Sequence, residues 1–152
     1  MIEAVRSAAA ADVDELRRLE DRARTALIDQ RGGSAVLDEL PPIDWRSALG
    51  EVVVATIDDV VVGYLHLTID QRTATVASVY VDPQAREVGL GDEMLTVAFE
   101  RARQAGCDVL EGWSLPGDRS TKNLYERAGV VARKIIVSRR LSDPSTAERA
   151  FQ

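Results

Sequence analysis

The sequence predicts a mixed α/β (α+β) fold, in which a mostly antiparallel sheet is flanked by helices. Two observations lead to this prediction. First, β-branched residues form short runs in the middle of the chain, whereas the segments around them repeat apolar residues every three or four positions, as amphipathic helices do. Second, three strand-like runs follow one another directly and the next is reached through a helix, which indicates an antiparallel meander followed by a parallel crossover. The predicted order is β-α-α-β-β-β-α-β-α-β.

The first half of the chain predicts one strand and two helical stretches. Residues 2–7 form the strand, and a helix spans residues 12–30, where Asp12 and Glu15 resemble a capping box. The apolar positions of that helix are Val13, Leu16, Leu19, Ala23 and Leu27. The sequence RGGS ends it, and a second helical stretch at residues 34–49 is interrupted by two prolines.

The second half predicts the meander and the crossover. Residues 51–70 hold two β-branched runs around Asp58 and Asp59, which favours a hairpin, and residues 72–81 form the next strand. An amphipathic helix covers residues 90–105, with Gly106 as its C-cap. The remaining pieces are a strand at 107–115, a helix at 117–129, a last strand at 130–141 and a loosely held tail at 142–152.

The composition is that of a soluble globular protein, which we expect to form a single domain over residues 1–152. Hydrophobic residues make up 45% of the chain and charged residues 29%. A net charge of -6 argues against nucleic acid as a partner, since phosphate contacts need a basic surface. The chain has neither a signal-peptide pattern nor an apolar run close to the roughly 20 residues of a membrane helix. We therefore expect a cytoplasmic protein with no membrane partner.

Cysteine and histidine usage argues against disulfides and metal sites. The single cysteine, Cys107, cannot form an internal disulfide, which agrees with a reducing cytoplasm. The single histidine, His66, lies far from it in sequence, so we expect no structural zinc and predict no metal cofactor.

The loop VDPQAREVGLGDEM, at residues 81–94, has the chemistry of an anion site. It lies between a predicted strand and a predicted helix, whose first turn offers free N–H groups and a partial positive charge. Gly89 and Gly91 allow close approach to the backbone, and Arg86 adds a charged fork. Taken alone, the pattern also fits an ordinary strand–helix turn. It matches neither the dinucleotide-binding fingerprint nor a Walker loop.

Two signatures together resemble those of the GCN5-related N-acetyltransferase (GNAT) superfamily. The first is the acetyl-CoA-binding segment, matched by Val81, Pro83, Arg86, Gly89 and Gly91. The second is LYERAG at residues 124–129, and VVVGYLHL is similar to the family's third strand. The resemblance implies a GNAT-like fold with a mixed, mostly antiparallel sheet of six to seven strands and about four helices. It also implies acetyl-CoA as co-substrate.

The resemblance further implies which residues hold the cofactor. The pyrophosphate would be bound by the backbone amides of Glu87, Val88, Gly89, Leu90, Gly91 and Asp92, beside Arg86. Pantetheine would pair with the main chain of Val79, Tyr80 and Val81 like an added strand. Asp92 is an unusual neighbour for a pyrophosphate, and we favour a carboxylate that is stabilised by the helix dipole and points away from the ligand.

On the following helix, Tyr125 aligns with the family's frequent general acid, which protonates the leaving thiolate. The alternative is a tyrosine that only packs beside the pantetheine. Asp118 stands where the family commonly has Asn, so it either contacts pantetheine or caps the helix. Arg119 and Lys122 are candidates for the CoA phosphates.

No residue matches the family's usual general base. The two positions that carry glutamate in relatives are about Thr75 and Trp113 here. Glu111 lies two residues before Trp113 on the same strand face and is the best substitute, although it also fits an exposed strand glutamate. Weaker candidates are Asp44, His66 and Asp70.

The leading hypothesis is direct transfer of an acetyl group to a primary amine of a small molecule, a peptide N-terminus or a lysine. An alternative is a catalytically weak acyl-CoA-binding sensor or partner-binding module, which the absent glutamates favour. A ligand-free structural dimer is a third. We expect the acceptor pocket to lie between the N-terminal helices, the loop at residues 40–45 and the final hairpin, lined by Trp45 and Trp113. The sequence leaves monomer and homodimer open.

Overall fold

A computed structural model describes residues 1–142 of the chain. Up to residue 127, its helices and strands follow one another along the chain in the order that the sequence predicts. The elements are β1 (Glu3–Ser7), α1 (Val13–Leu27), α2 (Gly33–Glu39), α3 (Trp45–Ala48), β2 (Val52–Ile57), β3 (Val60–Asp70), β4 (Thr73–Val81), α4 (Leu90–Gln104), β5 (Val109–Glu111) and α5 (Arg119–Arg127).

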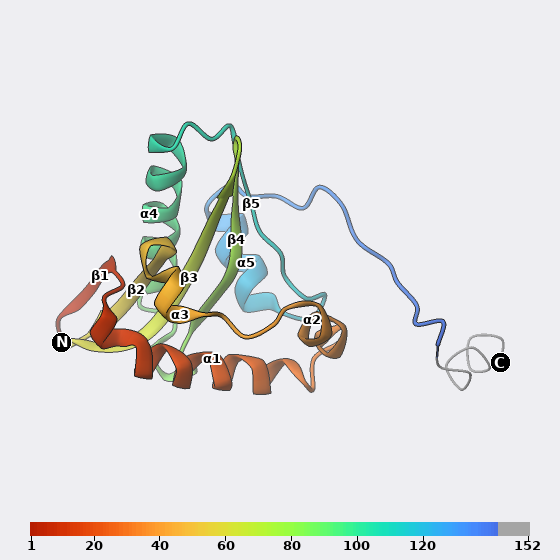
Figure 1. The fold of residues 1–152 in the computed structure, drawn as a ribbon, viewed down its shortest axis with the longest axis horizontal. Coiled ribbons are helices and arrows are strands. Elements are labelled where there is room, and N and C mark those ends of the chain that lie inside the picture. The colour runs from red at the N-terminus through yellow and green to blue at the C-terminus, as the bar shows by residue number, and fades with distance from the viewer. Residues whose placement is uncertain (143–152) are drawn as a thin grey trace.

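The strands form one mixed sheet in the order β1-β2-β3-β4-β5 (Figure 1). The first four strands pair antiparallel, and β5 pairs with β4 in parallel after the crossover through α4. The meander and the crossover are therefore confirmed, and with them the mixed α/β class. None of the helices in residues 1–142 is long and apolar enough to cross a membrane.

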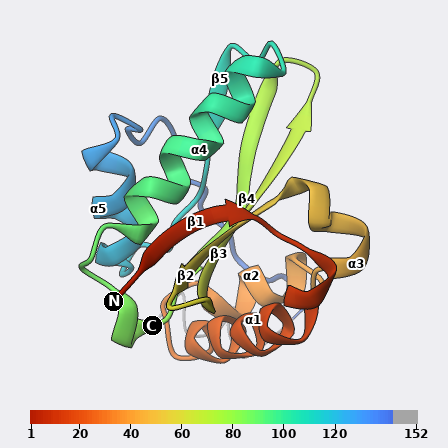
Figure 2. The same cartoon turned by 90° about the vertical axis from the view of Figure 1, so that its left-hand side faces the viewer.

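Helices cover both faces of the sheet, and each face has its own core. The buried face of α4 packs on one side, where Met94 and Leu95 meet Val53 and Leu65. On the other side α1 and α3 bring Leu16 and Trp45 against the sheet. Figure 2 shows α4 and α1 on opposite faces.

The structure confirms the predicted hairpin turn at Asp58 and Asp59 and the predicted helix C-cap at Gly106. Asp58 and Asp59 both have positive φ, at 49° and 67°, which suits the tight hairpin between β2 and β3. Gly106 ends α4 with φ at 79°, and the N–H of Cys107 donates to the carbonyl of Ala102, as a helix C-cap requires.

The predicted capping box at the start of α1 is wrong. Asp12 precedes the helix, but its side chain makes no capping bond to it. The carboxylate instead accepts hydrogen bonds from both terminal nitrogens of Arg6, at 2.7 and 2.9 Å, and from the N–H of Ala9. Asp12 thus caps the 3-10 turn Ala10–Asp12 that precedes α1 and pairs with Arg6 of β1, whose hydrogen bond holds the pKa of Asp12 below its usual value.

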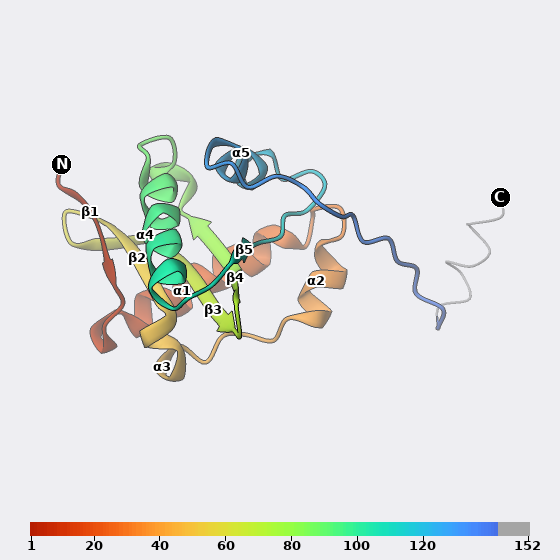
Figure 3. The ribbon, with the colours of Figure 1, turned by 90° about the horizontal axis from the view of Figure 1, so that it is seen from above.

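The predicted last strand is also absent, so the described sheet has five strands rather than six to seven. Residues 130–142 form no helix or strand and extend away from the rest of the molecule (Figures 1 and 3). The segment has strand-like composition, but a strand also needs a neighbouring edge, and this segment lies beside none in the described part of the chain. The prediction of a loosely held tail lies, from residue 143 on, outside the described residues.

Candidate functional site

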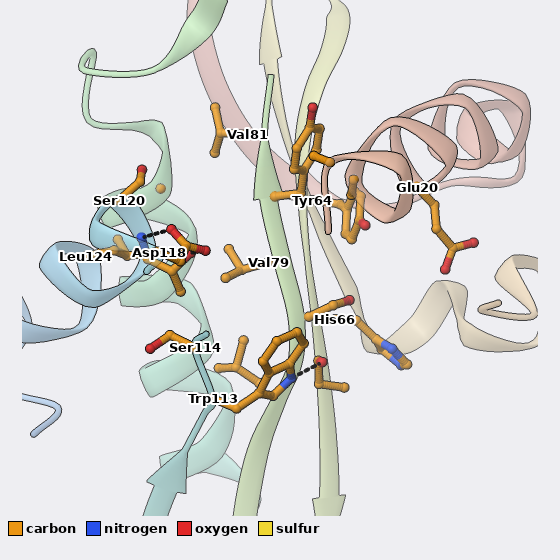
Figure 4. A pocket seen from close by; sticks show the side chains of 18 of the residues that line it. Glu20, Tyr64, His66, Val79, Val81, Trp113, Ser114, Asp118, Ser120 and Leu124 are labelled. Carbon is orange, nitrogen blue, oxygen red and sulfur yellow. Dashed lines mark hydrogen bonds between the residues drawn. The ribbon is translucent and has the colours of Figure 1, made fainter. Parts of the chain in front are cut away.

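A cavity of about 1080 Å³ lies beside β4, between the α1–α3 side of the molecule and α5 (Figure 4). Its walls come from α1, the loop before α3, β3, β4, the loop into α4, the segment after β5, and α5. Elements from both halves of the chain therefore meet at this one cavity.

The cavity opens because β4 and β5 separate. Their parallel register covers only Thr73 to Thr75 on β4 and Val109 to Glu111 on β5. Beyond it, β4 continues to Val81 while the chain after β5 turns towards α5. The edge of β4 that faces away from β3 is thus free of β5 from Val76 onward, and its backbone groups border the cavity.

A β-bulge lies at the point of separation. Ser78 is opposite His66 and Val76 is opposite Leu67, so Ala77 is an extra residue of β4 with no partner on β3. Its carbonyl oxygen instead accepts a 2.7 Å hydrogen bond from the indole Nε1 of Trp113. This bond bridges β4 and the segment after β5, at the base of the gap that opens between them.

The loop into α4 has the geometry of an anion site. Glu87 and Gly89 both have positive φ, at 71° and 86°, so the backbone alternates in hand as in anion-binding nests. The loop leads directly into a 15-residue helix, whose first N–H groups have no partner within it. A Cβ at Gly89 would meet nothing within 4 Å, so the space beside it is open, and Glu87, Gly89, Leu90 and Gly91 line the cavity.

Arg86 lines the cavity but points back onto β4. Its Nε donates to the carbonyl oxygen of Val81 at 2.9 Å, and its guanidinium lies 5.7 Å from the ring centre of Tyr80. It therefore braces the strand end from which the loop starts.

Asp92, in the first turn of α4, accepts a 3.0 Å hydrogen bond from Nε of Arg127 on α5. This ion pair joins α4 and α5 at the cavity wall, and both of its residues line the cavity. Arg127 thus supplies a positive charge beside the anion loop that the sequence analysis missed, although it lies inside the LYERAG signature.

Asp118 caps α5, as one of the two sequence interpretations predicts. Its carboxylate accepts from the N–H of Thr121 at 3.0 Å and from the Thr121 hydroxyl at 2.7 Å. The residue also lines the cavity. Lys122 lies outside the cavity lining and donates to the carbonyl of Pro116, which fixes the loop before the helix.

Tyr125 lines the cavity at the base of the gap, with its side chain buried. Its hydroxyl lies beside the backbone of Trp113, without a well-aligned hydrogen bond, and against Gly112, where an added Cβ would overlap it. Only glycine at position 112 lets the ring approach the segment after β5 so closely. Burial raises the pKa of Tyr125 to about 12, so the phenol is neutral at physiological pH.

The opposite wall carries carboxylates and the histidine. Glu20 is buried on α1 and accepts from the N–H of Ile43 at 2.9 Å and from Nε1 of Trp45 at 3.2 Å, which fixes the loop before α3. Burial raises the pKa of this carboxyl. The sequence signal for this residue was a carboxylate on the otherwise apolar, buried face of α1, and the sequence analysis did not single it out.

His66 lines the same wall from β3, with Nε2 at 3.1 Å from Oε1 of Glu51. Its side chain is 13% exposed, whereas that of Glu51 is 50% exposed. The contact with Glu51 leaves the other ring nitrogen, Nδ1, without a hydrogen bond in residues 1–142.

The structure thus brings most of the expected cofactor residues to one cavity. The lining includes Val79, Tyr80, Val81, Arg86, Glu87, Gly89, Leu90, Gly91, Asp92, Asp118 and Tyr125. Val88, Glu111 and Lys122 are not part of it. Asp44 and Trp113 line the cavity, whereas Trp45 is buried in the core behind it. Within residues 1–142 no three metal-ligating side chains come together.

Comparisons with known proteins agree with the fold and show the family of the chain. A family model described as "Acetyltransferase (GNAT) family" matches residues 13–130. No curated protein matches the chain.

Three solved structures have a similar fold. Aminoglycoside N-acetyltransferase AAC(6')-Iy in complex with CoA has a TM-score of 0.68 at 14% identity, covering 93% of this chain and 96% of its own. The protein yncA from Salmonella typhimurium, with its cofactor acetyl-CoA, has a TM-score of 0.63 at 20% identity, covering 84% of this chain and 78% of its own. The ribosomal-protein-S18-alanine N-acetyltransferase from Escherichia coli has a TM-score of 0.63 at 18% identity, covering 84% and 77%.

Proposed function

Because the chain belongs to the acetyltransferase (GNAT) family, we propose that it transfers the acetyl group of acetyl-CoA directly to a primary amine. The observation that carries this proposal is the continuity of one cavity. It connects the anion loop before α4, the free edge of β4 and the buried phenol of Tyr125. Both substrates would bind together, since nothing in the transfer requires a covalent acetyl-enzyme.

The donor would bind along β4 and the loop. Its pyrophosphate fits the backbone N–H groups from Glu87 to Asp92, with Arg127 nearby. Its pantetheine arm fits the gap, where the unpaired edge of Val79 to Val81 offers main-chain hydrogen bonds as a neighbouring strand would. The thioester would then lie close to the bulge and to Tyr125.

The chemistry requires one proton to leave and one to arrive. The amine lone pair attacks the thioester carbonyl carbon, the tetrahedral intermediate collapses, and the C–S bond breaks with its electron pair on sulfur. The neutral hydroxyl of Tyr125 is the proposed donor to this thiolate.

The attacking amine must first be neutral and must lose a second proton after attack. Glu111, the residue that the sequence favours as general base, is exposed on β5 outside the cavity lining. Its role as base stays a prediction that no contact supports. His66 is better placed, because it lines the cavity and Glu51 can hold its Nε2–H, which leaves Nδ1 to accept the proton. We therefore propose His66 as the base and Glu51 as the residue that orients it.

Thiol release from acetyl-CoA on an amine panel tests the activity. The panel would contain an aminoglycoside, a peptide with an N-terminal alanine and a peptide whose only free amine is a lysine. We expect release with at least one class, and lower kcat in Tyr125→Phe and His66→Gln at unchanged affinity for acetyl-CoA. Binding of acetyl-CoA without thiol release on any amine would favour the sensor alternative.

A further inference from the structure

Glu20 is a buried carboxylate that lacks a counter-ion. It is 6% exposed and lines the cavity from α1. One oxygen accepts from the N–H of Ile43 and the other from Nε1 of Trp45, although an ionised carboxylate offers about four acceptor positions in all. Within residues 1–142 no lysine, arginine or histidine forms an ion pair with it. Because an unpaired buried charge costs free energy, such a group at a cavity points to a ligand.

The other charged residues on this wall are engaged elsewhere. Arg24, one turn further along α1, donates to two carbonyl oxygens at the end of α2, at 2.8 and 3.4 Å, rather than to Glu20. Asp44 caps α3, and Glu51 contacts His66. Among the described lining residues between 20 and 66, three acids therefore stand against one arginine. The resulting negative charge favours a cation as the occupant of this part of the cavity.

Aromatic rings lie on the same wall. Tyr64 lines the cavity from β3 at 2% exposure, and its hydroxyl lies beside Ser78 without a well-aligned hydrogen bond. Burial, and after it the negative charge of Glu20, keeps the pKa of this phenol above its usual value, so the phenol is neutral. The ring of Tyr80 follows at 6.2 Å between ring centres. A carboxylate beside aromatic rings is the chemistry that recognises an ammonium group.

We propose that Glu20 binds a second ammonium group of the acceptor, so that the favoured acceptors are compact diamines. This inference rests on the proposed transfer to a primary amine. Figure 4 shows Glu20, Tyr64 and His66 on one side of β4, and Asp118 and Leu124 on the other. The proposed base and the proposed ammonium site therefore share one half of the cavity, and the donor residues of α5 border the other.

The strand sets the spacing of the two nitrogens. Tyr64 and His66 are two residues apart on the same face of β3, so their Cα atoms lie about 7 Å apart. A diamine whose nitrogens are roughly that far apart places one at His66 and the other at Glu20. A monoamine of the same length leaves Glu20 without a cation.

Paired acceptors test the role of Glu20. The probes are straight-chain diamines of increasing length and, for each, the monoamine of the same length. In the wild type we expect kcat/KM for the best diamine to exceed that for its monoamine by at least about tenfold. Glu20→Gln removes the charge and nearly keeps the shape, and should bring this ratio to about one. Asp21→Asn is the matched control, because it makes the same change at the next residue, which is exposed and outside the cavity lining, and it should keep the ratio.

The ratio separates recognition from a structural role. A loop before α3 that is loosened in Glu20→Gln would slow both amines alike and leave the ratio unchanged, and circular dichroism checks that the variants fold. Calorimetric titration of the same amines in the presence of CoA measures their binding apart from catalysis. We expect the diamine to bind more tightly than the monoamine in the wild type and Asp21→Asn, and equally in Glu20→Gln.

Equal affinity and equal kcat/KM for diamine and monoamine in the wild type would overturn the role of Glu20 without any variant. A diamine advantage that persists in Glu20→Gln, or that is lost in Asp21→Asn as well, would overturn it too. Selective binding of diamines without thiol release would instead contradict the proposed transfer and leave the role of Glu20 in place. Failure of this inference and failure of the proposed function are therefore different results.

Discussion

The indole Nε1 of Trp113 donates a 2.7 Å hydrogen bond to the carbonyl oxygen of Ala77, across the point where β4 and β5 separate. Ala77 is the bulged residue of β4, so its carbonyl has no partner on β3. The bond satisfies that carbonyl and sets the width of the gap. The proposed place of the pantetheine arm is this gap.

Trp113→Phe should therefore weaken acetyl-CoA binding. Loss of one partly buried hydrogen bond costs about 1 kcal/mol, which corresponds to roughly a fivefold rise in Kd when the gap loses its shape. Calorimetric titration measures this change. Trp45→Phe is the control, because it also removes an indole hydrogen bond, but one to Glu20 on the opposite wall of the cavity, away from the gap between β4 and β5. Equal effects of the two variants on affinity would contradict the role given to the Trp113–Ala77 bond.

Substitutions of Asp118 distinguish its role as a helix cap from a direct contact with the cofactor. Asp118→Ala removes the acceptor for the N–H of Thr121 and should lower the free energy of unfolding by about 1 kcal/mol. Asp118→Asn keeps a capping oxygen and should stay near the wild type. Urea denaturation compares the two variants. A loss of acetyl-CoA affinity in Asp118→Asn at unchanged stability would instead indicate a direct contact with the cofactor.

The sequence predicted local turns and helix starts better than it predicted the edges of the sheet. The loop before α4 and the turn at Asp58 depend on local chemistry, namely glycines, short acids and a helix start, which the sequence displays directly. The wrong capping box at Asp12 shows the limit of such rules, because Arg6 on the preceding strand pairs with the carboxylate.

Contacts between distant elements could not be predicted in the same way. The pairing of His66 with Glu51 depends on where the turn before β2 places Glu51 beside β3. The overlap of Gly112 and Tyr125 depends on how α5 approaches the segment after β5. The prediction of the last strand was wrong for a related reason. The β-propensity of a segment describes the segment itself and does not show whether a sheet edge lies beside it.

Stability at alkaline pH should report on the buried phenol of Tyr125. Its pKa is raised from 10.0 to about 12 in the folded chain, so between these values the unfolded chain ionises and the folded chain does not. Stability that is fully present below about pH 10 is therefore lost as pH rises towards about 12, by about 1.4 kcal/mol at about pH 11. Burial raises the pKa of Tyr64 as well, which adds to the loss in the same direction.

Comparison with Tyr125→Phe isolates the contribution of Tyr125, because Tyr64 and all lysines remain in both proteins. We expect the difference in free energy of unfolding between wild type and variant to fall by that amount from about pH 9 to about pH 11. A difference that does not change with pH would mean that the hydroxyl ionises as easily in the folded chain as in water.

Calorimetric titration of acetyl-CoA into the wild type and Gly89→Val shows whether the loop before α4 holds the cofactor. Gly106→Val is the control, since Gly89 and Gly106 have similar positive φ, at 86° and 79°, at opposite ends of α4. Both valines strain the backbone alike, by about 1–2 kcal/mol, but only one fills the space beside the loop. We predict binding to the wild type and Gly106→Val, and at least about tenfold weaker binding to Gly89→Val, or about 1.4 kcal/mol. No binding of millimolar acetyl-CoA to the wild type, or equal binding to all three proteins, would show that the loop before α4 does not hold the cofactor.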